Sequence, residues 1–523
     1  MDSETSPLLN DNQQRAETGA NHGRANSDNT PQANLPACPS PRPSVVILLV
    51  AFIIFTQSTS GALAAVPLTR LLEDAICRRY YSNRSDKVPI DEGRCKVDEV
   101  QSDLAYLNGF LSALEAVVGL LVALPYGVLA DKIGRKPVMV LGAVGSFLSF
   151  LWVLLVLRLE PHIPVHALLV SPAFLVVGGG NGAILAAFYA TISDVVSEVD
   201  RASAFFFISF SALMGPFVGP VLSSFLMQRT SPWAPLLLTA AIALLGLGVI
   251  AFIPETLVPP KETEDDDDDD DDEQEGEENP PANANGNISS TIATHLRSSL
   301  SRLANSVKML KSWSLALVLS TFTIQDMELV ATSQFFVQYI SKRFDWSLAE
   351  AGYLLSIRGT INIVLLLVVL PGLSRLLVSS ASPLQLSPAR RDLVLARASA
   401  LFFAVGAVLL AGPSVSLAIA GLALNTLGSG LSSLCRSLAT TYVDAQHTTA
   451  LYSLISIADV VGSLYAGPAL AWLFQTGMRL GGLWLGLPYV GLAVMLALAA
   501  VALVFVRVSS GAWGQVEAVG GED

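Results

Sequence analysis

The stretch Gly127-Val-Leu-Ala-Asp131-Lys132-Ile-Gly134-Arg135-Lys136-Pro137 lies between two apolar segments, each long enough to cross a lipid bilayer. About 20 apolar residues span the hydrocarbon core as a helix, because each residue adds about 1.5 Å and every backbone amide must be bonded within the segment. The charged side chains of the turn cannot enter that core at low cost. The turn therefore joins two membrane helices at the membrane surface.

The composition of the whole chain agrees with a membrane protein. Of 523 residues, 52% are hydrophobic and only 14% are charged, which is more apolar surface than one water-soluble core can bury. The net charge of −13 comes from one segment, since residues 261–278 hold 14 acidic residues and one lysine, leaving 30 acidic and 30 basic residues elsewhere. The acidity is therefore a property of a linker and not of a binding face.

Apolar stretches of membrane-spanning length occur twelve times along the chain. We predict an all-α membrane protein with transmembrane helices near 44–67, 104–126, 137–157, 165–192, 203–226, 233–253, 313–337, 349–370, 393–412, 414–436, 449–474 and 482–507.

The acidic segment divides these spans into two sets of six. It contains eight consecutive aspartates and cannot bury enough surface to fold; binding of a metal or a partner by the aspartates is the alternative to a solvated linker. The predicted parts are a disordered cytosolic tail (1–43), a six-helix bundle (44–254), an acidic disordered cytosolic linker (255–311), a second six-helix bundle (312–507) and a cytosolic tail (508–523).

The charged turn matches the pattern G-x-x-x-D-[RK]-x-G-[RK]-[RK] at every fixed position. It resembles the cytoplasmic loop between the second and third helices of major facilitator superfamily transporters. The resemblance implies that Asp131 lies at the N-terminal dipole of span 11 and that Arg135 pairs with Asp194, locking the two halves together. A positive-inside anchor without gating is the alternative. The gating residues implied are Gly127, Asp131, Lys132, Gly134, Arg135, Lys136 and Asp194.

Span 5 carries Gly215-Pro216-Phe-Val-Gly219-Pro220, which resembles the G-P-x-x-G-[GP] element of antiporters in this superfamily, although Ser211 replaces the upstream glycine. Proline removes a helical hydrogen bond and glycine permits close approach, so Gly215, Pro216, Gly219 and Pro220 are predicted to let the helix bend. This favours export, but such glycines also occur in ordinary helix packing. The glycine-rich 178–182 stretch of span 4 is more simply explained by close packing than by ligand contact.

Five charged residues are predicted at mid-membrane depth, where an unpaired charge is costly and functional by default. A carboxyl group there can take up or release a proton as its exposure changes. Glu115 is the first candidate for proton coupling and Asp326 the second, followed by Glu328 and Asp459. A Glu115 that only bonds a neighbouring helix is the alternative.

The fifth charge, Arg358, precedes Asn362 by four residues, so both side chains lie on one helix face. The arginine would either clamp a substrate carboxylate or phosphate or pair permanently with Asp326 or Asp459. The predicted substrate-binding residues are Gln57, Asn108, Asn181, Arg358, Asn362 and Asn425. Each amide taken alone is more often a helix-to-helix contact than a ligand contact.

The distribution of Lys and Arg places both termini in the cytosol, although the loop after the first span is an exception to the trend. In that loop Cys77 and Cys95 could form a disulfide, and Asn83 begins a glycosylation sequon, which requires a non-cytosolic face. Cys38 and Cys435 are expected to be free thiols. The tail sequence with Glu4, Leu8 and Leu9 resembles an acidic dileucine sorting signal, so we expect the vacuolar or the plasma membrane.

The chain contains no phosphate-binding loop, no His and Cys cluster with metal spacing and no Gly-x-Ser-x-Gly elbow, so we predict no enzyme activity, metal or cofactor. Pro254-Glu255, the acidic linker and residues 69–74 resemble fungal members of the superfamily.

The sequence thus predicts a secondary active transporter that moves a small organic molecule by alternating access, with proton-coupled efflux favoured. A proton symporter that imports a nutrient or organic anion is one alternative, and a non-transporting membrane receptor or scaffold is another. The expected partners are the lipid bilayer, the substrate and protons, with no nucleic acid, and the protein is expected to be a monomer.

Overall fold

The computed structural model describes residues 43–81, 91–160, 162–196, 198–255, 313–378, 387–443 and 448–507. The sorting signal, Cys38, the sequon at Asn83 and the acidic linker lie outside these residues. So do the side chains of Asp131 and Asn181, although both residues lie within helices.

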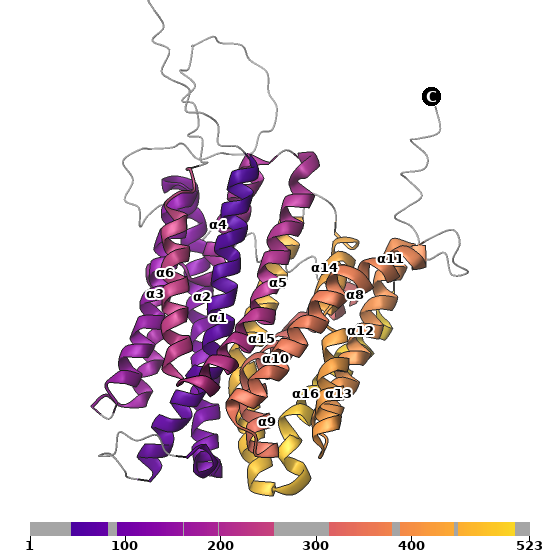
Figure 1. Ribbon diagram of the computed structural model, residues 1–523. Helices are drawn as coiled ribbons and strands as arrows, with labels where there is room; N and C mark the ends of the chain where they lie inside the picture. The colour runs from indigo at the N-terminus through magenta and orange to yellow at the C-terminus, as the bar shows by residue number, and fades with distance from the viewer. Residues whose placement is uncertain are drawn as a thin grey trace, which may run out of the picture. The chain divides into compact units, whose positions relative to one another are not determined.

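The first half of the described chain is entirely helical, with connecting turns (Figure 1). Its elements are α1 (Pro43–Tyr80), η1 (Glu92–Cys95), α2 (Asp98–Ile133), α3 (Arg135–Arg158), η2 (Val165–Val177), α4 (Gly180–Val195), α5 (Glu198–Arg229) and α6 (Trp233–Ile250).

The second half is built in the same way. Its elements are α8 (Trp313–Val330), η4 (Ala331–Phe335), α9 (Phe336–Phe344), α10 (Leu348–Val364), η5 (Leu365–Val369), α11 (Leu370–Val378), α12 (Pro388–Leu410), α13 (Val415–Leu427), α14 (Leu431–Thr440), α15 (Thr448–Leu480), η7 (Gly482–Gly486) and α16 (Leu487–Phe505).

Within the described residues, twelve helical segments are long and apolar enough to cross a membrane, six in each half. The predicted all-α fold of two six-helix bundles is confirmed. Several helices extend beyond the predicted spans; α1 continues to Tyr80, although the apolar stretch was expected to end near residue 67. Hydropathy falls where polar side chains begin, but backbone hydrogen bonding continues. At about 1.5 Å per residue, α1 is about 57 Å long and projects beyond a hydrocarbon core of about 30 Å.

Helices α1 and α5 pack along their length, and a proline in each leaves a carbonyl that the partner helix satisfies. Pro67 of α1 has no N–H, so the carbonyl of Leu63 loses its helical donor. The hydroxyl of Ser223 on α5 donates to that carbonyl at 2.8 Å.

The reciprocal bond lies one to two turns away. Pro216 of α5 leaves the carbonyl of Ala212 without its helical donor, and the hydroxyl of Ser58 on α1 donates to it at 2.6 Å. A Cβ on Gly215 would lie 2.2 Å from the Ser58 hydroxyl oxygen, so glycine is needed for the approach. The motif of span 5 therefore contributes directly to α1–α5 packing.

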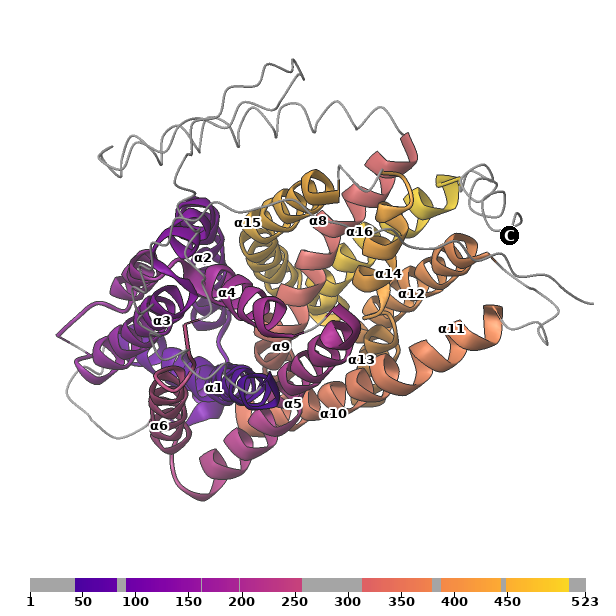
Figure 2. The same cartoon turned by 90° about the horizontal axis from the view of Figure 1, so that it is seen from above.

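The two halves meet mainly along two helix pairs, α2 with α15 and α5 with α10 (Figure 2). A Cβ on Gly109 of α2 would lie 2.7 Å from the carbonyl oxygen of Gly467 on α15. A Cβ on Gly359 of α10 would lie 2.7 Å from the carbonyl oxygen of Pro216 on α5. Both crossings thus require glycine beside a proline-containing segment.

We call the end of the bundle that contains Cys77 and Cys95 the disulfide end, and the end that contains Gly134 the turn end. The buried apolar residues of the first half form two separate clusters, one around Met139 and Phe188 and the other around Leu104 and Leu168. The second half has one larger cluster.

Candidate functional site

The charged turn is held by the carboxylate of Glu255, which follows α6, the last helix of the same half. Helix α2 ends at Ile133, Gly134 has φ 105°, and α3 begins at Arg135. The side chain of Glu255 accepts hydrogen bonds from the backbone N–H groups of Arg135, at 2.9 Å, and Lys136, at 3.1 Å. An anionic acceptor at a helix N-terminus satisfies otherwise unpaired N–H groups and opposes the positive end of the helix dipole.

Gly134 is required here by its backbone and by space. Its φ lies in the left-handed region, and a Cβ would lie 2.5 Å from a carboxylate oxygen of Glu255. Lys136 also contributes, since its Nζ donates to the carbonyl of Ala251 at 2.7 Å. The contact of Glu255 with the turn could not be predicted from the sequence, because nothing in the local pattern around Glu255 indicates a partner more than 100 residues earlier.

Arg135 also forms the ion pair implied by the family resemblance, with its Nε 3.8 Å from Asp194 Oδ2. These residues belong to α3 and α4, so the pair ties together two helices of the same half. It does not by itself connect the two halves.

In the second half, Arg358 of α10 pairs with Glu328 of α8, with Nη2 and Oε1 3.6 Å apart. Glu328 is 6% exposed and also accepts a hydrogen bond from Thr332 at 3.1 Å. The two partners considered for Arg358 from the sequence, Asp326 and Asp459, are therefore not the ones it contacts. Helical periodicity predicts which residues share a face of one helix, but not which face of the next helix it meets.

Two further acids of this half were predicted at mid-membrane depth, and of these Asp459 pairs with a second arginine and Asp326 with a serine. Arg436 Nη2 is 3.1 Å from Asp459 Oδ2, and its guanidinium carbon lies 5.6 Å from the centre of the Phe322 ring. Ser463 donates a hydrogen bond to Asp326. Arg436 was missed because it falls at the predicted end of span 10, where a cation is an ordinary membrane anchor. The structure places it inside α14.

Glu115 differs in its surroundings from Glu328 and Asp459, which are both paired with arginines. Its side chain is exposed on α2, and no hydrogen bond or ion pair joins its carboxylate to another described residue. Ser112, one turn away, donates at 2.5 Å to Gln334 of η4, a π-helical turn in the other half. Such turns occur frequently at functional sites. Glu115 therefore lies beside a contact between the halves.

The predicted substrate-binding amides do not converge on one cavity. Asn425 is fully buried and donates to the Phe403 carbonyl at 3.4 Å, a helix-to-helix contact. Asn362 accepts a bond from Ser429 at 2.6 Å, and Asn108 is half-buried. Gln57 lines a cavity of about 200 Å³ whose walls come only from α1, α3, α4 and α6, all in the first half. Gln57, which we predicted from the sequence to bind substrate, therefore faces a cavity within the first half and not the space between the halves.

Gly178, in the glycine-rich stretch of span 4, packs closely against α3. This agrees with our prediction that the stretch serves close packing and not ligand contact. A Cβ on Gly178 would lie 2.2 Å from the Leu141 carbonyl oxygen, and one on Gly145 would lie 2.9 Å from the Phe174 carbonyl oxygen. Here the sequence pattern correctly predicted the packing.

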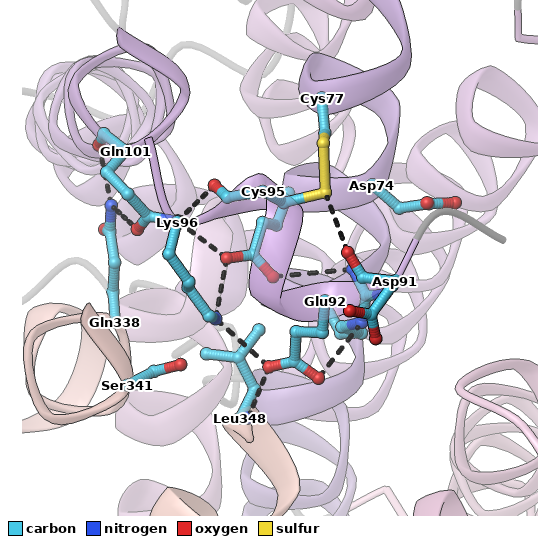
Figure 3. Close-up of polar contacts among 12 residues, drawn as sticks. Asp74, Cys77, Asp91, Glu92, Cys95, Lys96, Gln101, Gln338, Ser341 and Leu348 are labelled. Atoms are coloured by element: carbon cyan, nitrogen blue, oxygen red, sulfur yellow. Dashed lines mark hydrogen bonds and ion pairs between the residues drawn. A yellow bond between two sulfur atoms is a disulfide. The ribbon is translucent and has the colours of Figure 1, made fainter. Parts of the chain in front are cut away.

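At the disulfide end, the sulfur atoms of Cys77 and Cys95 are bonded to each other, which attaches η1 to α1 (Figure 3). Beside this bond, the buried carboxylate of Glu73 accepts hydrogen bonds from Lys96 at 2.8 Å and from Gln101 at 2.6 Å. Arg70 Nη1 lies 3.4 Å from the other carboxylate oxygen of Glu73. Glu73 is 0% exposed, so these three donors provide the compensation that a buried carboxylate requires.

The same polar network crosses to the second half. Gln338 donates to the Gln101 carbonyl at 2.7 Å, and Glu92 accepts the backbone N–H of Leu348 at 2.7 Å (Figure 3). A further contact joins Lys342 Nζ to Asp98 Oδ1 at 2.6 Å. We call this set the disulfide-end latch; it consists of Glu73, Glu92, Lys96, Asp98, Gln101, Gln338, Lys342 and Leu348.

Comparison with known proteins identifies the class. The model of the Major Facilitator Superfamily matches residues 47–463. The MFS efflux pump atnC of Emericella nidulans is 31% identical over 453 residues, covering 85% of this chain and 84% of the relative. The MFS-type transporter aprT of Aspergillus flavus is 30% identical, with 88% of each chain covered.

Solved structures agree at the level of the fold. A D-xylose-proton symporter matches with a TM-score of 0.60 at 15% identity, covering 89% of this chain and 98% of the other. These matches correspond to transporters and not to enzymes. With twelve candidate spans in two bundles and the charged turn between its second and third membrane helices, this chain is a multi-pass membrane protein and belongs to the major facilitator superfamily.

Proposed function

We propose that this secondary transporter exports a small organic molecule by alternating access and couples export to protons. The observation that carries the proposal is the similarity to the efflux pump atnC over more than four fifths of both chains. A further relative, the efflux pump ustT of Aspergillus flavus, is 25% identical over 84% of this chain and 84% of its own length.

Glu115 is the proposed proton carrier. Its carboxylate is exposed on a membrane helix, beside the Ser112–Gln334 contact between the halves, whereas Glu328 and Asp459 are paired with arginines. A carboxylate whose surroundings change when the halves move can bind a proton in one state and release it in the other. Asp326 is the second candidate.

Alternating access further requires that the disulfide-end latch open and close. We infer that both termini face the cytosol, so the latch lies on the opposite side, where the Cys77–Cys95 disulfide and a glycan on Asn83 would form. In the proposed cycle, the state described by this structure is closed at that side by the contacts of Glu92, Gln101 and Lys342. The Arg135–Asp194 pair would organise the turn-end gate.

The substrate is best found by untargeted metabolite profiling of cells and medium, comparing the source organism with a strain that lacks the gene. Export predicts a compound that accumulates inside the deletion strain and falls in its medium. A compound that remains in the medium would instead support the import alternative. No change in any compound under conditions of expression would support the receptor alternative.

Proton coupling is tested with that compound in proteoliposomes. Glu115→Gln should reduce transport driven by a pH gradient by at least about tenfold, while substrate-for-substrate exchange continues, because exchange needs no net proton movement. Asp103→Asn is the matched control, since Asp103 is an exposed acid in the first turns of the same helix. Equal gradient-driven transport in both variants would exclude Glu115, and Asp326→Asn would be tested next.

A vacuolar location is proposed from the dileucine pattern, with the plasma membrane as the alternative. A fluorescent fusion should move from the vacuolar to the plasma membrane when Leu8 and Leu9 are both changed to alanine.

A further inference from the structure

The cavity around Gln57 lies inside the first bundle and not between the halves. Its walls are formed by one face of α1, together with residues of α3, α4 and α6. Gln57, Ser60, Gly61 and Ala64 of α1 belong to neither of the two apolar clusters of this bundle, whereas the lining residues Ile53, Ile184, Phe188 and Ile250 belong to the cluster around Met139 and Phe188. The cavity therefore borders this packed cluster.

The lining combines aromatic rings with hydroxyl groups. Phe147, Phe150 and Phe188 contribute rings, and Ser60 and Ser146 contribute hydroxyl groups. Both serine Oγ atoms are buried and have no hydrogen-bond partner among the described residues, and Ser60 is only 6% exposed. An unpaired buried hydroxyl is costly, and rotation of either serine side chain toward the cavity would give its hydroxyl a partner there, so the cavity favours an occupant with a hydrogen-bonding group.

Charge and size restrict that occupant. The lining contains no Asp, Glu, Lys, Arg or His, so an ionised ligand would enter without a counter-charge. The volume of about 200 Å³ is somewhat larger than the ~150 Å³ apolar cavity that is known to bind benzene. One aromatic ring with a small polar substituent therefore fits.

We propose that this cavity is a binding site for a small neutral aromatic molecule that carries one hydroxyl or similar hydrogen-bonding group. The ring packs among the phenylalanines, and the polar group bonds Ser60 and Ser146. Such a ligand dissolves in the bilayer and reaches the bundle from the membrane. The site is separate from the path between the two halves, so its occupancy does not depend on the proposed export or on proton coupling.

Gly61 offers a direct way to fill the cavity. It lines the cavity, and a Cβ added to it has no atom within 4 Å. Gly61→Met should therefore place its side chain in the open space without a backbone clash. Gly248→Met is the matched control, because Gly248 is also a helical glycine with no atom within 4 Å of an added Cβ, yet it does not line the cavity.

The experiment uses 4-fluorophenol and the full-length protein in lipid nanodiscs, with saturable binding followed by ¹⁹F NMR. We expect binding to wild type and to Gly248→Met, and none to Gly61→Met, whose folding is checked by thermal unfolding. Binding that is equal in all three proteins would place the probe elsewhere and overturn the proposal. Absence of saturable binding to wild type would do the same.

The hydroxyl groups are tested by a second comparison, which does not depend on Gly61→Met folding. The double variant Ser60→Ala, Ser146→Ala should bind 4-fluorophenol about fivefold or more weakly, which corresponds to losing at least one neutral hydrogen bond. Its binding of fluorobenzene, which has no hydroxyl, should be unchanged. If both probes bind this variant as they bind wild type, the cavity is an apolar pocket of the kind that a lipid chain would fill, and the proposed ligand class is wrong.

Discussion

At the N-terminus of α3, a single carboxylate organises the charged turn. Glu255 accepts two backbone N–H groups there, while Gly134 supplies the left-handed backbone and leaves space for the carboxylate. The motif that identifies the family therefore depends structurally on a residue outside the motif.

We predict that Glu255→Ala lowers the free energy of unfolding by about 1–3 kcal/mol, because the charge-assisted hydrogen bonds to Arg135 and Lys136 are lost. Thermal unfolding of the purified protein in one detergent measures the change. Lys132→Ala, an exposed position in the same turn, is the control. Equal melting temperatures for the two variants would show that the hydrogen bonds from Arg135 and Lys136 to Glu255 contribute nothing to stability.

Pairs of helices are joined by contacts that depend on both partners. In α1 and α5 each proline leaves a carbonyl unpaired, and a serine of the other helix pairs it. The prolines therefore create acceptors that hold the two helices in register.

We predict that Ser58→Ala costs about 1 kcal/mol of stability, because the Ala212 carbonyl then has no donor. In a Pro216→Ala background the cost should be smaller, since residue 216 regains the N–H that bonds this carbonyl within the helix. A double-mutant cycle of unfolding free energies measures this coupling. Ser209→Ala is the control, because Ser209 bonds a carbonyl of its own helix. A coupling of zero would contradict the assignment of the carbonyl.

The attachment of η1 to α1 gives a separate prediction. If Cys77 and Cys95 are bridged in the cell, alkylation of the denatured protein should label both cysteines only after reduction, as mass spectrometry would detect. Replacing both by serine should lower stability by roughly 3 kcal/mol, the size expected for closing a loop of this length. Cys435, which is buried and free, should become labelled on denaturation without reduction. Labelling of Cys77 without reduction would exclude the bridge.

Over the whole molecule, the two halves approach each other through glycines. We predict that Gly109→Ala favours opening of the disulfide end, because the new Cβ would meet the backbone of Gly467, which cannot rotate away. Gly119→Ala on the same helix is the control, since no atom lies within 4 Å of its added Cβ.

The opening is measured by double electron–electron resonance between spin labels at Glu99 and Leu483. These are two exposed positions on opposite halves near the disulfide end. The background lacks Cys38 and Cys435 and keeps the disulfide. The population at longer distances should increase in Gly109→Ala only. Identical distance distributions in the two alanine variants would contradict a role for the α2–α15 crossing in closure.

The fold class, the twelve spans and the family could all be predicted from the amino-acid sequence. These follow from local properties: each span must satisfy its own backbone in lipid, and the charged turn lies between two spans in one short stretch. The Arg135–Asp194 pair also followed from the resemblance, and the close packing of Gly178 and Gly179 followed from the absence of a side chain at glycine.

Which polar groups face each other could not be predicted from the sequence, because it depends on how the helices pack in three dimensions. Arg358 contacts Glu328 and not Asp326 or Asp459, Arg436 joins a charge pair, and Gln57 faces a cavity within one bundle. Periodicity gives the face of a residue on its own helix, whereas its partner depends on the rotation and tilt of a helix that is far away in the sequence. In membranes, the rotation and tilt of a helix depend on close packing between small residues of different helices. No single stretch of sequence contains enough information to predict that packing.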